Sequence, residues 1–206
     1  MRRASPRPLG RRGLVASEFA LVAPLFFLVA LGTADLIRLF RAQLRTEMIA
    51  VQIGQIVSQC RTITNPGDRN NFWTQAQRIA GTVIDVNSTN GGAIVISAVS
   101  RNTSASPATN RLSWQMRTGN AALVSRLGTT VNGTATISDS FVVPLSQTLM
   151  VTEVYAVVQP FTLTAGLIGT FLPRVIYGTT LFLSRAPDPT TLQTAPADSA
   201  TANCTA

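Results

Sequence analysis

The sequence predicts an α+β protein in which a long N-terminal transmembrane helix continues as an amphipathic spine and packs on a small antiparallel sheet. Three observations support this fold class. Residues 19–34 carry no charge, and residues 35–59 keep a helical repeat of apolar side chains without a proline. The remaining chain alternates short β-branched runs with turn-rich stretches. At 206 residues there is room for one membrane helix and one modest domain.

The membrane span is predicted over residues 14–37. The uncharged run alone would measure about 24 Å as a helix, short of the ~30 Å hydrocarbon core, whereas a start at Leu14 brings the apolar part to about 31 Å. Residues 1–13 then form a cytoplasmic basic leader, because arginines precede the span and a long polar region follows it. The charges of this leader are all basic and come from Arg2, Arg3, Arg7, Arg11 and Arg12.

One carboxylate, Glu18, stands at the head of this span. A charged side chain at the centre of a bilayer costs about 3 kcal/mol on insertion scales, and less near the interface. If the chain were cut after Gly13, the new α-amine on Leu14 would be a cation. Glu18 of a neighbouring subunit would then pair with that amine as chains assemble.

The spacing of Gly13, Glu18 and Phe19 resembles the type III signal of type IV pilins and pseudopilins. The string Glu18-Phe19-Ala20-Leu21-Val22-Ala23-Pro24-Leu25, and residues 32–40 after it, are similar to TadE-like pseudopilins of tight-adherence (Flp) pilus systems. This resemblance implies that a prepilin peptidase cleaves after Gly13 and that Leu14 starts the mature chain. Glu18 and Phe19 would be assembly residues. Whether the chain is of the TadE or the TadF type is left open.

The same resemblance implies partners and a location. The partners would be other pilins or pseudopilins, inner-membrane assembly proteins and membrane lipid, in a homo- or hetero-oligomer. The protein would cross the bacterial inner membrane once, with its N-terminus in the cytoplasm and its C-terminal domain in the periplasm. Its role would be that of a structural or assembly subunit of the pilus, and incorporation into the extracellular pilus stays open.

A second block of the chain is also similar to TadE-like proteins. It reads Val151-Thr152-Glu153-Val154-Tyr155 and is followed by Pro160. The sequence departs from the family at residues 156–158, where Ala-Val-Val replaces a more aromatic or basic stretch. The sequence assigns no role to Glu153, Tyr155 and Pro160. We expect Glu153 on the solvent face of an antiparallel strand.

Three other interpretations of the N-terminus compete with the pilin-type signal. The strongest is an uncleaved single-pass anchor that carries a periplasmic binding domain. A cleaved secretory signal is disfavoured because Ala30-Leu31-Gly32 is a mediocre cleavage site. A twin-arginine signal is disfavoured because the apolar stretch after Arg11-Arg12 is too long.

The domain is predicted over residues 38–185, including the helix extension. The apolar stripe of the spine consists of Ile37, Phe40, Leu44, Met48 and Val51, and Arg38, Arg41 and Arg45 form a solvated face. Turn chemistry at residues 65–68 ends this helix region. Asp68 is predicted to cap a second helix over residues 69–83, whose aligned apolar residues are Phe72, Ala76, Ile79 and Val83.

Four strands are predicted, at residues 93–99, 112–116, 149–158 and 175–184. Alternation places Leu112, Trp114 and Met116 on one face of the second strand. Residues 119–139 are expected to form loops with a short helix near residues 121–127. The apolar segment 161–172 is too short to span a bilayer and suits a buried or interfacial helix. The Pro, Thr and Ala-rich tail, residues 186–206, is expected to be mobile except near Cys204.

Composition argues against several function classes. Histidine is absent, the acids are scattered, and no phosphate-binding or dinucleotide fingerprint occurs, so we expect no enzyme, no cofactor and no metal site. Five of the 17 arginines lie in the leader, so the chain after residue 13 has 12 arginines against nine acids. This small excess of positive charge is not typical of a nucleic-acid-binding surface, and no nucleic-acid partner is expected. Cys60 and Cys204 would both lie outside the cytoplasm and form a possible disulfide. A reduced pair or a bridge to another subunit remain alternatives.

Overall fold

The computed structural model describes residues 12–137, 141–159 and 174–204, without the side chains of residues 12–15. The chain divides into two compact units, and the boundary along the first helix falls between Leu39 and Phe40. The first unit contains the beginning of that helix. The second contains the rest of it, a second helix and two sheets, so the α+β class is confirmed.

Helix α1 runs from Arg12 to Gln59 and contains Pro24. Within the described part of the chain it is the one helix that is long and apolar enough to cross a membrane, with a mean hydropathy of 2.1 over its most apolar window. Large side chains such as Phe19, Leu25 and Phe26 are exposed along its first unit. Exposed side chains of this kind suit a lipid environment, where proline is tolerated inside a helix.

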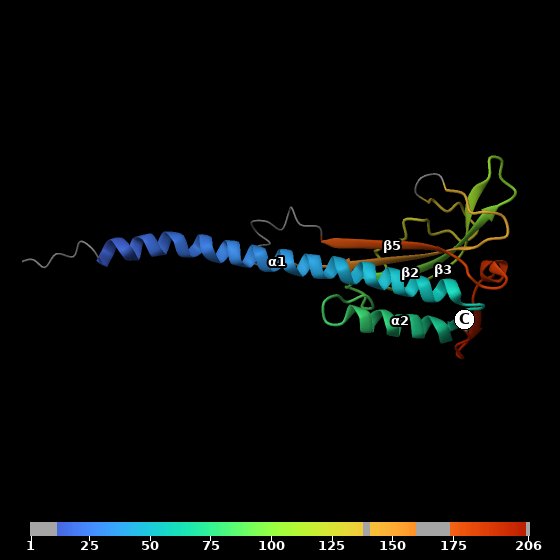
Figure 1. Ribbon diagram of the computed structural model, residues 1–206, viewed down its shortest axis with the longest axis horizontal. Coiled ribbons are helices and arrows are strands. Elements are labelled where there is room, and N and C mark those ends of the chain that lie inside the picture. Colours follow the sequence, from blue (N-terminus) through green and yellow to red (C-terminus); the bar gives the residue numbers. More distant parts are fainter. Residues whose placement is uncertain (1–11, 138–140, 160–173, 205–206) are drawn as a thin grey trace, which may run out of the picture. The chain divides into compact units, whose positions relative to one another are not determined.

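The domain is built on a four-stranded antiparallel sheet, shown in Figure 1. Its strands are β2 (Ala93–Asn102), β3 (Thr109–Gly119), β4 (Leu149–Val157) and β5 (Val175–Leu183), in the order β3-β2-β4-β5. The four predicted strands are therefore confirmed. β2 and β4 are the central strands, and their residues are buried almost throughout on both faces of the sheet.

The second half of α1 packs on one face of this sheet through small side chains. A Cβ atom added at Gly54 would lie 2.7 Å from the Thr180 Oγ1 atom, so helix and strand β5 are in close contact there. The Thr180 hydroxyl donates a hydrogen bond of 2.7 Å to the Ala50 carbonyl oxygen. The buried side chains of this helix face include Ala42, Ile49 and Ile53.

The predicted apolar stripe of the spine does not face the domain. Phe40, Leu44, Met48 and Val51 are all exposed, and Leu44 has 59% of its surface accessible. Where the helix comes closest to β5, at Ala50 and Gly54, its residues are small, and the larger Ile49 and Ile53 are buried beside them.

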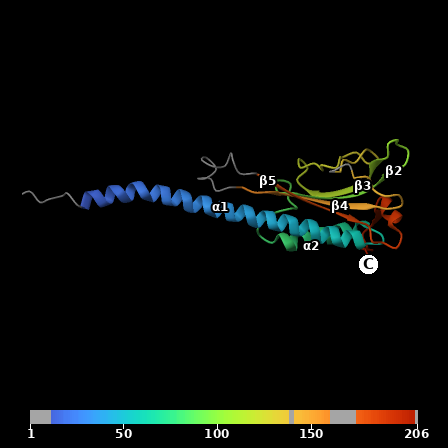
Figure 2. The same cartoon turned by 45° about the horizontal axis from the view of Figure 1, so that its top comes forward.

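Helix α2 extends from Gly67 to Ala80 and lies beside the last turns of α1 in both views (Figures 1 and 2). Arg45 on α1 donates a hydrogen bond of 3.0 Å to the Ile79 carbonyl oxygen. The predicted cap is wrong, because Pro66 occupies the N-cap position and Asp68 lies inside the first turn. The buried face consists of Gly67, Asp68, Phe72, Trp73, Ala76 and Ala80, rather than reaching Val83.

A β-bulge changes the faces of strand β3. The register pairs Ala98 with Trp114 but Val99 with Leu112, so Ser113 is an extra residue in β3. Leu112 and Trp114 therefore lie on opposite faces, and the prediction of a common face is wrong. Leu112 belongs to the cluster beneath the loops, whereas the Trp114 indole N–H donates to the Leu192 carbonyl oxygen at 2.7 Å.

The C-terminal tail is packed on the domain, contrary to expectation. A 3-10 helix, η2 (Pro189–Gln193), buries Leu192. Strand β6 (Ala197–Ser199) pairs in parallel with β1 (Thr64–Pro66). Residues 121–127 form turns and bends instead of the expected short helix. The prediction for residues 161–172 lies outside the described residues.

Candidate functional site

The residues of the predicted processing site lie at the start of α1. Arg12 is its first residue, Gly13 and Leu14 follow in its first turn, and Arg2, Arg3, Arg7 and Arg11 lie outside the described residues. The side chains of Glu18 and Phe19 are exposed. Glu18 makes no hydrogen bond or ion pair with any residue that the structure describes, so any partner of this carboxylate must come from elsewhere.

Glu153 is the most unexpected functional candidate in the domain, because it is fully buried. The prediction that it lies on a solvent face is wrong. β4 is a central strand, and the loop of residues 120–137 covers the sheet face opposite to α1. Glu153 and Tyr155 are two residues apart on β4, so their side chains point to the same face of the sheet, the one that the loop covers. The third residue of the block, Pro160, lies outside the described residues.

The carboxylate of Glu153 is surrounded by hydrogen-bond donors. The Ser125 hydroxyl donates to Glu153 Oε2, and the Arg126 backbone N–H donates to Oε1 at 2.9 Å. The Tyr177 hydroxyl donates to Oε1 at 3.0 Å. The Tyr155 hydroxyl lies 3.2 Å from Oε1 and 2.8 Å from the Val124 carbonyl oxygen. We call Glu153, Tyr155, Tyr177 and Ser125 the carboxylate cage.

The cage joins the covering loop to two strands. Tyr155 and Tyr177 lie opposite each other on β4 and β5, with ring centroids 5.1 Å apart, and the Arg126 guanidinium carbon lies 3.8 Å from the Tyr177 centroid. Burial and the nearby Glu153 raise the pKa of the Tyr155 hydroxyl well above its ordinary value. Burial likewise raises the pKa of Tyr177, to about 12. Both tyrosines therefore stay protonated as donors at neutral pH.

An apolar groove lies on the same side of the sheet as the cage. It has a volume of about 910 Å³, and its lining residues include Leu149, Leu181, Leu183 and Arg185. β5 is an edge strand of the sheet, so one of its sides has no strand partner among the described residues. The described residues contain no cluster of three or more groups that would hold a metal ion.

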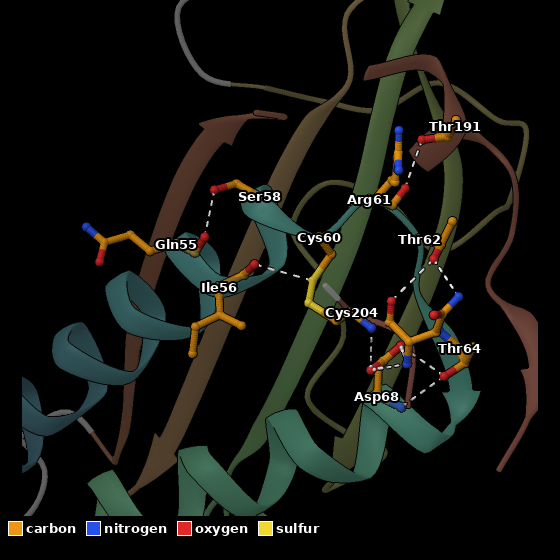
Figure 3. Close-up of a disulfide and its surroundings, with 11 residues drawn as sticks. Gln55, Ile56, Ser58, Cys60, Arg61, Thr62, Thr64, Asp68, Thr191 and Cys204 are labelled. Carbon is orange, nitrogen blue, oxygen red and sulfur yellow. Dashed lines mark hydrogen bonds between the residues drawn. A yellow bond between two sulfur atoms is a disulfide. The ribbon is translucent and has the colours of Figure 1, made fainter. Parts of the chain in front are cut away.

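A disulfide joins the end of α1 to the C-terminal tail, as Figure 3 shows. The sulfur atoms of Cys60 and Cys204 are bonded, and their Cα atoms lie 4.7 Å apart across a separation of 144 residues. Cys60 is fully buried. The structure therefore contains the internal bridge that the sequence left as one of three possibilities.

Asp68 lies beside this bridge and binds the tail through its carboxylate. It accepts hydrogen bonds of 2.9 Å from the backbone N–H groups of Asn203 and Cys204, and of 2.8 Å from the N–H of Thr64. Burial alone would raise the pKa of Asp68, but these N–H donors outweigh it and hold the pKa below its ordinary value. Nothing in the local sequence indicates this role, because the tail donors are backbone groups more than 130 residues away from Asp68.

The fold and the N-terminal helix define a class of protein: a small α+β domain carried on one helix with the length and composition of a single-pass membrane anchor. Residues 13–54 of the chain match the family of TadE-like proteins, which confirms the resemblance drawn from Glu18, Phe19 and the residues after them. The block around Glu153 lies outside the matched residues, so that part of the resemblance stays a prediction. No curated protein and no solved structure shows significant similarity to the chain.

Proposed function

We propose that this protein is a pseudopilin-like subunit of a tight-adherence pilus, which a prepilin peptidase cleaves between Gly13 and Leu14. The observation that carries the proposal is the TadE-like match over residues 13–54, which includes the cleavage position, Glu18 and the apolar helix. The mature chain assembles with pilins or pseudopilins in the bacterial inner membrane, with its domain in the periplasm. Its role is structural, and it catalyses no reaction.

The exposed stripe of α1 supports assembly through this helix. Phe40, Leu44, Met48 and Val51 recur on one helix face and remain uncovered by the described domain. A contiguous apolar surface of this kind is typical of interaction sites. In the proposed assembly the stripe extends helix–helix contact beyond the bilayer, and Glu18 pairs with the α-amine of a neighbouring subunit.

Cleavage is tested by sequencing the N-terminus of the protein purified from membranes that contain the prepilin peptidase. The expected sequence starts at Leu14. Gly13→Ala is expected to abolish processing, and a matched Gly10→Ala change in the same leader is expected to leave it intact. Identical migration of the wild type and the Gly13→Ala variant, both with Met1 retained, would exclude cleavage.

The roles of Glu18 and the stripe are tested by co-assembly. Glu18→Gln is expected to leave cleavage largely intact and to reduce recovery of pilus components, because the pairing charge is lost. Leu44→Glu places a charge in the stripe and is expected to reduce the same recovery, whereas Val124→Glu at another exposed apolar site in the domain serves as its control. Normal pilus output from both Glu18→Gln and Leu44→Glu would contradict the proposed assembly.

A second candidate function is an uncleaved anchor that carries a periplasmic binding domain. The apolar groove at Leu149 and Leu183 favours it, because apolar clefts of several hundred cubic ångströms are typical of ligand sites. Retention of the arginine-rich leader in the working protein is the result that would select this candidate over the pseudopilin.

A further inference from the structure

The contacts of Asp68 divide into a local part and a long-range part. Locally, the carboxylate accepts from the backbone N–H and hydroxyl of Thr64, at 2.8 and 2.9 Å. Across the chain, it accepts from two consecutive backbone N–H groups of the tail, those of Asn203 and Cys204. In Figure 3 the side chain of Asp68 points from α2 toward the tail, directly beneath the disulfide. One buried carboxylate therefore holds the residue that forms the bridge.

Other contacts support the tail without involving sulfur. The Thr64 hydroxyl lies 2.9 Å from the Thr201 carbonyl oxygen, and the Asn203 side-chain amide donates to the Thr62 hydroxyl at 2.9 Å. The backbone of Thr201 lies so close to Gly67 that an added Cβ atom would approach its carbonyl carbon to 2.6 Å. β6 adds a parallel pairing with β1 upstream of these contacts. The seat of the tail therefore consists of more than the covalent bond.

We propose that Asp68 is a positioning residue for the disulfide: its carboxylate seats the C-terminal tail and so holds the Cys204 thiol against Cys60 before oxidation. The cysteines are separated by 144 residues, and bringing the ends of so long a loop together has an entropic cost. Hydrogen bonds between the tail and the charged carboxylate offset this cost, because such bonds are stronger than hydrogen bonds between neutral groups.

The covalent step is thiol–disulfide exchange with an external disulfide, such as that of a dithiol oxidant protein or glutathione disulfide. One cysteine thiolate attacks one sulfur of the external disulfide, breaks its S–S bond, expels the other sulfur as a thiolate and forms a mixed disulfide. The second thiolate attacks the chain's sulfur in that mixed disulfide, forms the Cys60–Cys204 bond and releases the reduced oxidant. The two cysteines lose two electrons and two protons, and the oxidant gains them. Asp68 takes no part in these transfers.

The first test measures the equilibrium between the reduced and bridged full-length chain in glutathione buffers, with free thiols counted after acid quenching and alkylation. Asp68→Asn replaces an acceptor oxygen by an NH₂ group that opposes the N–H donors of the tail. We expect the equilibrium constant for bridge formation to fall about tenfold to a hundredfold, the range that loss of a hydrogen bond to a charged group gives. Asp198→Asn, at an exposed position on β6, is the matched control and is expected to change nothing. An unchanged constant in Asp68→Asn overturns the proposal.

The second test removes the covalent bond and so remains informative if Asp68→Asn folds poorly. In the Cys60→Ser, Cys204→Ser double variant, the amides of residues 203 and 204 are expected to stay protected from hydrogen exchange, because the carboxylate still binds them. Adding Asp68→Asn to this background is expected to abolish that protection, while exchange in β2 and β4 stays slow. Fast exchange at both tail amides with Asp68 intact overturns the proposal, because the tail would then depend on the disulfide alone.

Discussion

Replacement of Glu153 by alanine is expected to release the loop that covers the sheet. Three donors lose their acceptor in this variant, namely the Arg126 N–H and the hydroxyls of Ser125 and Tyr177. Tyr155 keeps the Val124 carbonyl oxygen as an acceptor. An unsatisfied buried donor costs about 1–3 kcal/mol, and the hydroxyls can turn toward other acceptors. We therefore expect Glu153→Ala to lower the free energy of unfolding by about 3–5 kcal/mol.

Glu153→Gln separates the shape of the side chain from its charge. The amide keeps one oxygen near the position of Oε1, where Arg126 and Tyr177 donate, and loses the acceptor that faces Ser125. We expect a loss of about 1–2 kcal/mol, because one acceptor is replaced and the remaining hydrogen bonds go to a neutral oxygen. Glu47→Ala, at an exposed acid on α1, is the control and is expected to change stability by less than about 0.5 kcal/mol.

Two measurements check these values. Urea unfolding of the disulfide-intact chain in detergent gives the free energies, and trypsin cleavage at Arg126 reports the loop itself. All basic residues of the chain are arginine, so trypsin can cleave only after arginines, and the mass of each fragment identifies the cleaved site. Cleavage after Arg126 is expected to accelerate more than cleavage at other sites in Glu153→Ala. A loss of stability below about 1 kcal/mol with unchanged cleavage would refute the reasoning, because the cage would then not hold the loop.

Three further predictions concern the sheet. The chain has two tyrosines, and both belong to the cage, so a phenolate absorbance titration reports the cage alone. Tyr155→Phe should leave one transition, near the Tyr177 pKa of about 12. An ordinary midpoint near 10 in the folded variant would contradict the described burial of Tyr177. Because the pKa of Tyr177 is raised in the folded state, the contribution of Tyr177 to stability should be complete below pH ~10 and be lost as the pH rises toward about 12. Thr152→Val should raise the unfolding free energy by about 1 kcal/mol, since the buried Thr152 hydroxyl has no partner among the described residues; a loss of that size would point to an unseen partner. Gly54→Ala should lower the unfolding free energy by about 1–2 kcal/mol, although alanine has a better helix propensity than glycine, because the new Cβ atom would lie too close to Thr180. A net gain in the unfolding free energy would mean that β5 shifts easily.

The sequence predicts the strands of this domain well and their surroundings poorly. β-branched runs mark β2, β4 and β5, because such side chains suit a pleated surface that is packed on both sides. A single extra residue, Ser113, is enough to move Trp114 to the other face, and nothing in the local pattern announces it. The same holds for Glu153, whose burial depends on a Gly, Ser and Thr-rich loop with no visible apolar repeat.

The helix α1 shows a different limit of sequence reasoning. Its length, its start in the basic region and its apolar character all follow from the sequence. The orientation of its second half does not, because this half has large apolar residues on two faces: Ile49 and Ile53 are buried, whereas Leu44 and Met48 are exposed. Ala50 and Gly54 contact β5, and the larger Leu44 and Met48 are left outside.

Asp68 and Glu153 have the same structural role: each carboxylate binds a segment that is distant in the sequence. Each is a buried acid that accepts backbone N–H groups from a segment with few large apolar side chains, the tail in one case and the covering loop in the other. Such segments bury too little apolar surface to be held by the hydrophobic effect alone. Hydrogen bonds to a carboxylate add to the packing of the few buried apolar side chains, such as Leu127 and Leu192, and so help to order both segments. The domain can therefore close its loop and its tail while large apolar side chains of α1, such as Leu44, remain exposed, where they are available for the proposed assembly contacts.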